Sequence, residues 1–87
     1  MMKWKRFYNV RKSKRGGYYC FFYIVEQQYY ADLCFTVDHG DECMIFEAKD
    51  NTVTNWSELY VSLVPVSKSN LIACIEEFIE ENNNNHV

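Results

Sequence analysis

The residues with the most potential for chemistry in this chain gather around His39. Asp38 and Asp41 flank this histidine, and Cys43 follows shortly after them. A cysteine beside a histidine is the pairing of a thiol nucleophile with its base. The same stretch is also an ordinary hairpin-turn sequence, in which Asp and Gly are common for conformational reasons. The other histidine, His86, is distant in the sequence. We therefore predict that the chain is not an enzyme.

A metal or phosphate site is also poorly supported by the sequence. Asp38, His39, Asp41 and Glu42 are close together, but their spacing does not match an EF-hand loop, and zinc sites draw on paired Cys and His residues. The Gly-Gly pair at 16–17 lies between two predicted strands, whereas a phosphate-binding glycine loop precedes a helix. The prediction is that the chain has no metal site and no cofactor.

The four cysteines, which are Cys20, Cys34, Cys43 and Cys74, have irregular spacing and no C-x-x-C motif. An even number is compatible with disulfides in an exported protein. The apolar run at 18–25 is rich in tyrosine, too short to span a bilayer, and not followed by a cleavage signal. We therefore expect a cytoplasmic protein with reduced and mostly buried thiols, and no association with membranes.

Charge is divided sharply along the chain. Seven of the nine basic residues occur among the first fifteen positions, and the twelve acidic residues all come later. The net charge of −3 conceals this division. Such asymmetry predicts contact with a charged partner but does not identify the partner.

Alternating apolar and polar residues, separated by turn signals, predict strands at 3–12, 18–26, 29–38 and 42–49. A fifth strand at 59–64 is less regular, and the stretch 52–64 leaves open a strand or a short helix. A helix is predicted at 68–81, capped by Ser67 or Ser69. Its apolar stripe is Leu71, Ile72, Ile75, Phe78 and Ile79.

The predicted fold class is α+β: an antiparallel β-meander of four to five strands with one C-terminal helix packed on one face. At 87 residues the chain is expected to form a single domain, 1–81, followed by a disordered Asn-rich tail, 82–87.

Two-residue turns at 16–17, 27–28 and 39–40 would set the register of this meander. Counting from them places Phe22 opposite Leu33, and Phe35 opposite Met44. The face under the helix is then expected to be apolar. It would contain Phe7, Cys20, Phe22, Ile24, Ala31, Leu33, Phe35, Val37, Met44, Phe46 and Ala48.

The opposite face is expected to be uncovered, with aromatic and basic residues on one side and acidic residues on the other. It would contain Arg6, Tyr8, Val10, Lys12, Tyr19, Phe21, Tyr23, Val25, Tyr30, Asp32, Cys34, Thr36, Asp38, Asp41, Cys43, Ile45 and Glu47. Asp32 would lie opposite Glu47, and Asp38 opposite Asp41. Like charges in these positions cost stability, and a partner that supplied cations would remove that cost.

From this arrangement we predict a non-catalytic protein-binding module that acts by occlusion through its acidic and aromatic sheet face. Aromatic anchors give a large contact area at low entropic cost, while charges guide the encounter. The partner is expected to be another protein with a basic patch. By analogy of size and charge alone, the module would be a small inhibitor or immunity-type protein, such as a phage or mobile-element anti-defence protein. The predicted protein-binding residues are Tyr19, Phe21, Tyr23, Tyr30, Asp32, Asp38, Asp41, Glu42 and Glu47.

The alternative is a regulatory or single-stranded nucleic-acid-binding module. Basic residues interleaved with rings are typical of sheets that stack bases, although the RNP-type signature is missing. The residues predicted for this role are Lys3, Lys5, Arg6, Arg11, Lys12, Lys14 and Arg15. Two further interpretations remain open: self-association as a homodimer, and basic residues that only protect the sheet edge from aggregation.

Overall fold

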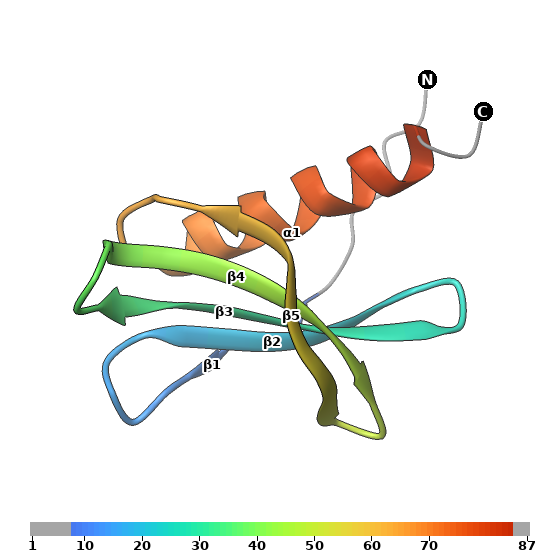
Figure 1. The fold of residues 1–87 in the computed structure, drawn as a ribbon, viewed down its shortest axis with the longest axis horizontal. Helices are drawn as coiled ribbons and strands as arrows, with labels where there is room; N and C mark the ends of the chain where they lie inside the picture. The colour runs from blue at the N-terminus through green and yellow to red at the C-terminus, as the bar shows by residue number, and fades with distance from the viewer. Residues whose placement is uncertain (1–7, 85–87) are drawn as a thin grey trace.

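The computed structural model describes residues 8–84, and these form a five-stranded antiparallel meander with one C-terminal helix, as predicted (Figure 1). The strands are β1 (Arg11–Lys12), β2 (Tyr18–Ile24), β3 (Gln27–Thr36), β4 (Gly40–Lys49) and β5 (Thr52–Ser62), and they lie in the sheet in chain order. The stretch 52–62 is therefore a strand and not a short helix. The predicted strand residues 3–7 lie outside the described part of the chain.

The helix α1 (Lys68–Asn84) begins where the sequence predicted but ends later than the expected Glu81. Ser67 is its N-cap, because its Oγ accepts a hydrogen bond of 3.0 Å from the backbone N–H of Asn70. Near the other end, the side-chain amide of Asn82 donates to the carbonyl oxygen of Phe78 at 3.1 Å. Asn82 thus belongs to the helix and not to a tail.

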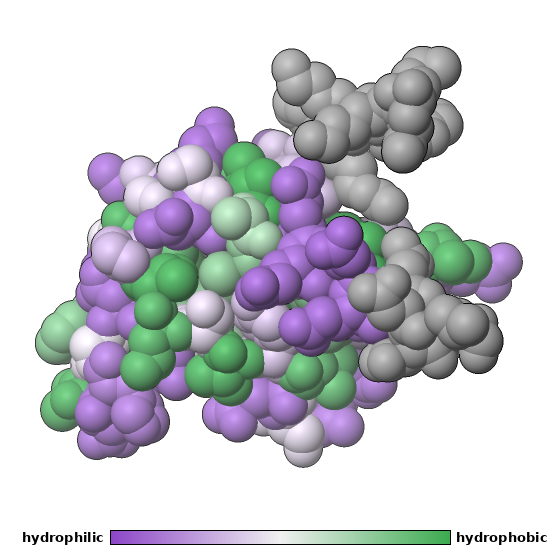
Figure 2. Space-filling view, turned by 90° about the horizontal axis from the view of Figure 1, so that it is seen from above, coloured by the Kyte–Doolittle hydropathy of each residue, from purple (hydrophilic) through white to green (hydrophobic). Residues whose placement is uncertain are grey.

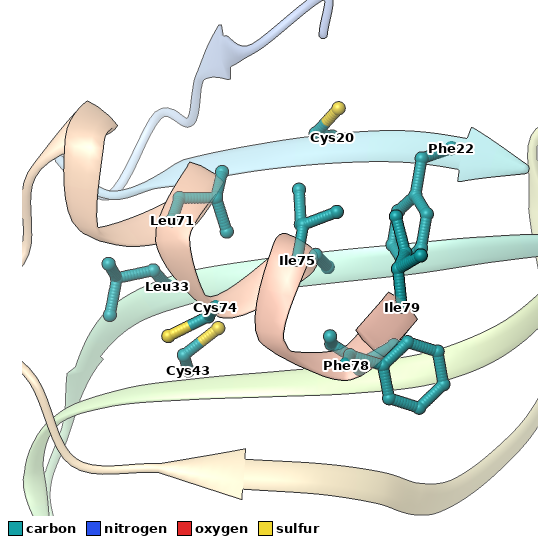
Figure 3. Close-up of a cluster of buried hydrophobic side chains, with 11 residues drawn as sticks. Cys20, Phe22, Leu33, Cys43, Leu71, Cys74, Ile75, Phe78 and Ile79 are labelled. Atoms are coloured by element: carbon teal, nitrogen blue, oxygen red, sulfur yellow. The ribbon is translucent and has the colours of Figure 1, made fainter. Parts of the chain in front are cut away.

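The core lies between α1 and one face of the sheet (Figure 3). Leu71, Cys74, Ile75, Phe78 and Ile79 recur at helical spacing and are all buried. They meet buried side chains of β2, β3 and β4, namely Cys20, Phe22, Ala31, Leu33, Cys43 and Ile45. Ile72, which was predicted to belong to this stripe, is only half-buried. Cys74, which was not predicted, is buried in the stripe.

The register differs from the prediction at the turn between β3 and β4. Thr36 pairs with Gly40, so three residues, 37–39, form the connection in place of a two-residue turn. Gly40 begins β4 with a φ of 72°, a conformation that glycine adopts without strain. Because side chains alternate along a strand, this odd shift exchanges the two faces of β4. Cys43 and Ile45 therefore lie under the helix.

The two faces of β1 are also exchanged relative to the prediction, because the β1–β2 turn differs from the expected one. Gly16, at a φ of 92°, closes a turn in which its N–H bonds to the carbonyl oxygen of Ser13, and Arg11 then pairs with Tyr19. Arg11, and not Lys12, shares a face with Tyr19. Tyr8 and Val10, predicted on the uncovered face, instead pack against the core.

Between β2 and β3 the predicted faces are correct although the register is not. The turn is at 25–26, so Phe22 pairs with Tyr29 and Leu33 pairs with Tyr18. This shift moves the partner of each residue by an even number of positions, which leaves every side chain on its predicted face. The turn at 50–51 is as expected: Asp50 and Asn51 both have a positive φ, as a two-residue hairpin turn requires.

Candidate functional site

The sheet face opposite α1, called the open face below, carries a continuous row of aromatic rings. Tyr19 and Phe21 both contact Tyr30, with ring centroids 6.0 and 5.0 Å apart. Tyr30 in turn lies 6.3 Å from Phe46, and Phe46 lies 5.0 Å from Trp56. These five residues, the ring row, come from β2, β3, β4 and β5. The only helix formed by residues 8–84 is on the other side of the sheet (Figure 1).

The ring row is only partly accessible. Phe46 is buried by its neighbours, whereas Trp56 is 69% exposed and covers one edge of it. Trp56 reaches this position because β5 bulges. Tyr60 pairs with Ile45 and Asn55 pairs with Glu47, so the four residues 56–59 lie opposite the single residue Phe46. The accessible part of the row is thus concentrated at Trp56.

Within the described part of the chain, Tyr23 is the other exposed ring on this face, at 56%. It forms a wall between two shallow hollows of about 370 and 350 Å³. The larger hollow is also lined by Arg11, Tyr19 and Phe21, and the smaller by Lys49 and Asp50. Tyr23 thus combines an exposed ring with a hollow on each of two sides of the residue, where side chains of a binding partner could fit.

Asp32 is the acidic group embedded among these rings. Burial raises the pKa of its carboxyl above the ordinary value of 3.8, and the opposing effects of the Cys34 thiol and of Arg15 are smaller. The Cys34 Sγ donates to Asp32 Oδ2 at 3.7 Å. A hollow of about 210 Å³ separates this pair from Lys14 and Arg15 of the β1–β2 turn. A carboxylate held in this way gains from a further cation.

Tyr30, next to Asp32, stays protonated over the physiological range. Burial in the first place, and then the negative charge of Asp32, raise the pKa of Tyr30 to about 12. Its hydroxyl is therefore available as a hydrogen-bond donor on the open face.

The structure does not bring the predicted acidic residues together. Asp41 and Glu47 lie on the helix side of β4, since they pair with Phe35 and Tyr29. Asp41 Oδ2 accepts a 2.9 Å hydrogen bond from the backbone N–H of Val66, which makes its role structural. Asp32 pairs with Met44, so the expected contact with Glu47 is wrong, as is the contact between Asp38 and Asp41.

Glu42, Asp38 and the acidic residues of α1 are not part of the ring row either. Glu42 is on the open face but buried, and Asp38 lies in the exposed β3–β4 turn. The four glutamates of α1, which are Glu76, Glu77, Glu80 and Glu81, are exposed on the helix side. Hydrophilic residues cover much of that side, with hydrophobic ones between them (Figure 2).

The basic residues divide in a similar way. Arg11 lines the hollow beside Tyr23, and Lys14 and Arg15 line the hollow beside Asp32. Lys12 pairs with Tyr18 and therefore belongs to the helix side. Lys3, Lys5 and Arg6 lie outside the described residues. The open face thus has a basic margin along its β1 edge.

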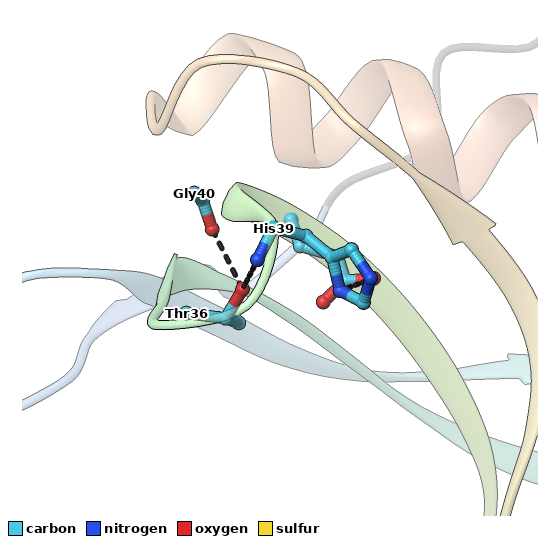
Figure 4. A network of polar contacts seen from close by, with 4 residues as sticks. Thr36, His39 and Gly40 are labelled. Carbon is cyan, nitrogen blue, oxygen red and sulfur yellow. Dashed lines mark hydrogen bonds and ion pairs between the residues drawn. The ribbon is translucent and has the colours of Figure 1, made fainter.

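The segment around His39 forms a tight turn. The backbone N–H of His39 donates to Thr36 Oγ1 at 3.1 Å, and that hydroxyl donates to the carbonyl oxygen of Gly40 at 2.9 Å (Figure 4). His39 Nδ1 lies 3.6 Å from Glu42 Oε2. Cys43 is fully buried under the helix, and burial raises the pKa of its thiol, so it is not a nucleophile for His39.

Metal-ligand geometry gives no further candidate. Among residues 8–84, no three His, Cys, Asp or Glu side chains are grouped in a way that would hold an ion.

Sequence reasoning missed Phe46 and Trp56. It placed Phe46 on the face under the helix because it placed the turn at 39–40. It left Trp56 in a stretch with two possible structures. Gly40 was the available signal. A glycine directly after three turn residues indicates a three-residue hairpin loop, and that loop length gives the correct faces of β4.

In comparisons with known proteins, no family model matches this chain, and no curated protein or solved structure is significantly similar to it. No helix within the described range, 8–84, has the length and apolarity to cross a lipid bilayer.

Proposed function

We propose that this chain is a non-catalytic binding protein whose open face is the contact surface for another protein. The observation that supports this proposal best is the ring row, which joins four strands through successive ring contacts on the side of the sheet away from α1. Aromatic rings are the side chains that most often dominate protein–protein binding energy. Trp56 and Tyr23, the two most exposed rings of this face among residues 8–84, would be the anchors.

The partner would contribute a cationic side chain at Asp32. The carboxylate of Asp32 has lost part of its hydration, and Tyr19 and Tyr30 lie beside it on the neighbouring strand and its own strand. A lysine or arginine of the partner would find a negative charge and ring faces together, and both favour a cation. A basic patch thus remains the expected chemistry of the partner, with one carboxylate as the main charged contact instead of several.

Binding of this kind acts by occlusion. A sheet face that covers the basic or aromatic surface of another protein prevents that surface from reaching its own substrate. Small inhibitors and immunity-type proteins work in this way, and phage anti-defence proteins are one such class. The comparison with them is one of size and charge.

The test is a capture experiment with two exposed-ring variants and a matched control. Trp56→Ala and Tyr23→Ala are expected to weaken binding of a partner identified by mass spectrometry, each by about 2 kcal/mol, which corresponds to roughly thirtyfold in Kd. Phe35→Ala removes an equally exposed ring (67%) at the other side of the sheet and is expected to leave binding unchanged. Equal losses in all three variants would contradict the proposal.

A second candidate function, binding of single-stranded nucleic acid, is favoured by the basic margin of the open face. Arg11 lies beside Tyr19 and Tyr23, an arrangement in which bases stack on rings while phosphates meet guanidinium groups. Asp32 and Glu42 on the same face disfavour it, because each would repel phosphate.

The two functions are separated by titrating a labelled single-stranded oligonucleotide of mixed sequence. Nucleic-acid binding predicts an affinity that falls steeply with rising salt and is weakened by Arg11→Ala. It also predicts little effect of Lys12→Ala, because Lys12 is on the helix side. No binding near physiological salt would exclude this second function.

A further inference from the structure

β5 is an unprotected edge of the sheet. It has eleven residues and pairs with β4 along one side, and no other strand within residues 8–84 pairs with its outer side. Proteins usually protect such an edge with lysine, proline or short length, since its free backbone groups can pair with another chain. β5 contains no Lys, Arg or Pro, and Glu58 is its only charged residue. At the opposite edge, β1 has two residues, and both are basic.

The accessible stretch of this edge is the end of β5 from Leu59 to Ser62, together with Leu63, which directly follows the strand. Residues 60–62 pair regularly with β4, whereas the bulge at 56–59 bends the preceding part of the strand away. Leu59, Val61 and Leu63 are 44%, 48% and 62% exposed. Because side chains alternate along a strand, these three share one face, and Val61 pairs with Met44 of the open face.

We propose that two copies of this chain associate through their β5 edges, as an antiparallel pair with Val61 opposite Val61 of the second copy. The stretch 59–63 is uncharged, so a two-fold axis brings no like charges together. With the axis at Val61, Leu59 lies opposite Leu63 of the second copy, and each of the three apolar side chains meets an apolar one.

Neighbouring registers are worse. An axis at Tyr60 places Leu63 opposite Ser57, and an axis at Ser62 places Leu59 opposite Pro65, which has no N–H for the ladder. The stretch is therefore complementary to itself in one register. This self-complementarity favours a second copy of the chain as the binding partner of the edge.

The acidic helices do not prevent this association. α1 packs on β2, β3 and β4, so about five strand spacings of 4.8 Å each, roughly 24 Å, separate the two helices in the joined sheet. This distance exceeds the Debye length of about 8 Å at physiological salt, so repulsion between the two helices is largely screened. Glu77 is the glutamate of α1 placed nearest to the joined edges, because it accepts a hydrogen bond from the Tyr60 hydroxyl of β5. The result is a ten-stranded sheet in which the two open faces are continuous. The proposal concerns the edge and does not depend on what the open face binds.

The experiment is sedimentation velocity or light scattering of the full chain from low micromolar to millimolar concentration. We expect a reversible dimer of twice 10.4 kDa. Val61→Lys places two ammonium groups across the axis and is expected to raise the dimer Kd by about tenfold or more. Val37→Lys, at a fully exposed valine in the β3–β4 turn, is the matched control and leaves the dimer intact. Circular dichroism establishes that each variant is folded.

A mixing experiment tests the register itself. Val61→Glu alone is expected to weaken the dimer as Val61→Lys does, and an equimolar mixture of the two restores the dimer affinity, because opposite charges then face each other across the axis. A chain that stays monomeric at all concentrations would overturn the proposal. So would a dimer that Val61→Lys leaves intact, or capture of a different protein by the β5 edge of a monomeric chain.

Discussion

Gln28 and Asn51 join the beginning of β3 to the turn between β4 and β5 through two reciprocal hydrogen bonds. The Gln28 Nε2 donates to Asn51 Oδ1 at 2.7 Å, and the backbone N–H of Asn51 donates to Gln28 Oε1 at 2.8 Å. Gln28 is buried, and it lines both hollows beside Tyr23. These two hydrogen bonds therefore fix the β4–β5 turn, in which Asp50 and Asn51 have positive φ, to the start of β3 beside the open face.

Replacement of Gln28 tests this pair. Gln28→Met keeps the length of the side chain but removes both hydrogen bonds, and we expect the free energy of unfolding to fall by about 1–3 kcal/mol. Gln27→Met is the matched control. Gln27 is exposed, and water can replace the hydrogen bonds that its Nε2 donates to the carbonyl oxygens of Gln28 and Ala48. We expect the free energy of unfolding to fall by no more than about 0.5 kcal/mol in this variant. Urea unfolding measures both values. Similar losses in the two variants would show that the buried pair has no special role.

Gly17 is required by close packing and not by its backbone conformation. A Cβ atom at this position would lie 2.4 Å from the carbonyl oxygen of Leu33 and 2.7 Å from the Cβ of Cys34. Gly17→Ala is therefore expected to displace β3 and to destabilise the fold by about 1–3 kcal/mol. It also disturbs the Asp32–Cys34 pair, which nuclear magnetic resonance shifts of residues 32–34 would report.

Gly16→Ala is the comparison, since a Cβ there meets no atom within 4 Å and the cost comes from its φ of 92° alone. Gly16→Asn is expected to recover part of that cost, because Asn tolerates positive φ, whereas Gly17→Asn is worse than Gly17→Ala. Recovery of stability in Gly17→Asn would contradict the packing explanation.

The buried charge of Asp32 predicts an unusual dependence of stability on pH. Its pKa is raised in the folded state, so the folded chain binds the proton more strongly than the unfolded chain. The contribution of this group to stability is then present in acid and lost as the pH rises from 3.8 through the folded pKa. Asp32→Asn is expected to raise the Tm at pH 7, and the difference from the unmodified chain should vanish below the unfolded pKa. Thermal unfolding at a series of pH values measures this difference.

Asp38→Asn, at an exposed turn position, is the control and should give no such gain. If Asp32→Asn lowers the Tm at neutral pH, its interactions with Cys34 and Arg15 outweigh the loss of hydration.

Cys34 is expected to be the one thiol that reacts in the folded chain. Cys20, Cys43 and Cys74 are buried, whereas Cys34 is half-buried beside a hollow of the open face. Burial first, and then the charge of Asp32, raise the pKa of Cys34 above its ordinary value of 9.0, so its thiolate is scarce at neutral pH. Labelling with a disulfide reagent should modify one thiol slowly, with a rate that increases with pH and is higher in Asp32→Asn. Labelling in the folded Cys34→Ser variant at an unchanged rate would be inconsistent with this assignment.

The residues of the open face show where sequence reasoning succeeds. Tyr19, Phe21, Tyr23, Tyr30 and Asp32 were placed on the uncovered side and are found there, because alternation within β2 and β3 depends only on neighbouring positions in the chain. Their role in binding stays a prediction. Phe46 and Trp56 were missed, and Asp41 and Glu47 were assigned to the wrong side.

Local patterns in the sequence by themselves determined the meander, the closing helix with a serine cap at Ser67 or Ser69, and the apolar side of β2 and β3. These features depend on hydrophobic periodicity and turn chemistry, which act over a few residues. Only the tertiary structure decided which way the side chains of β1 and β4 point. A turn of three residues in place of two exchanges both faces of the following strand, and that choice is made when Cys43 and Ile45 pack against α1.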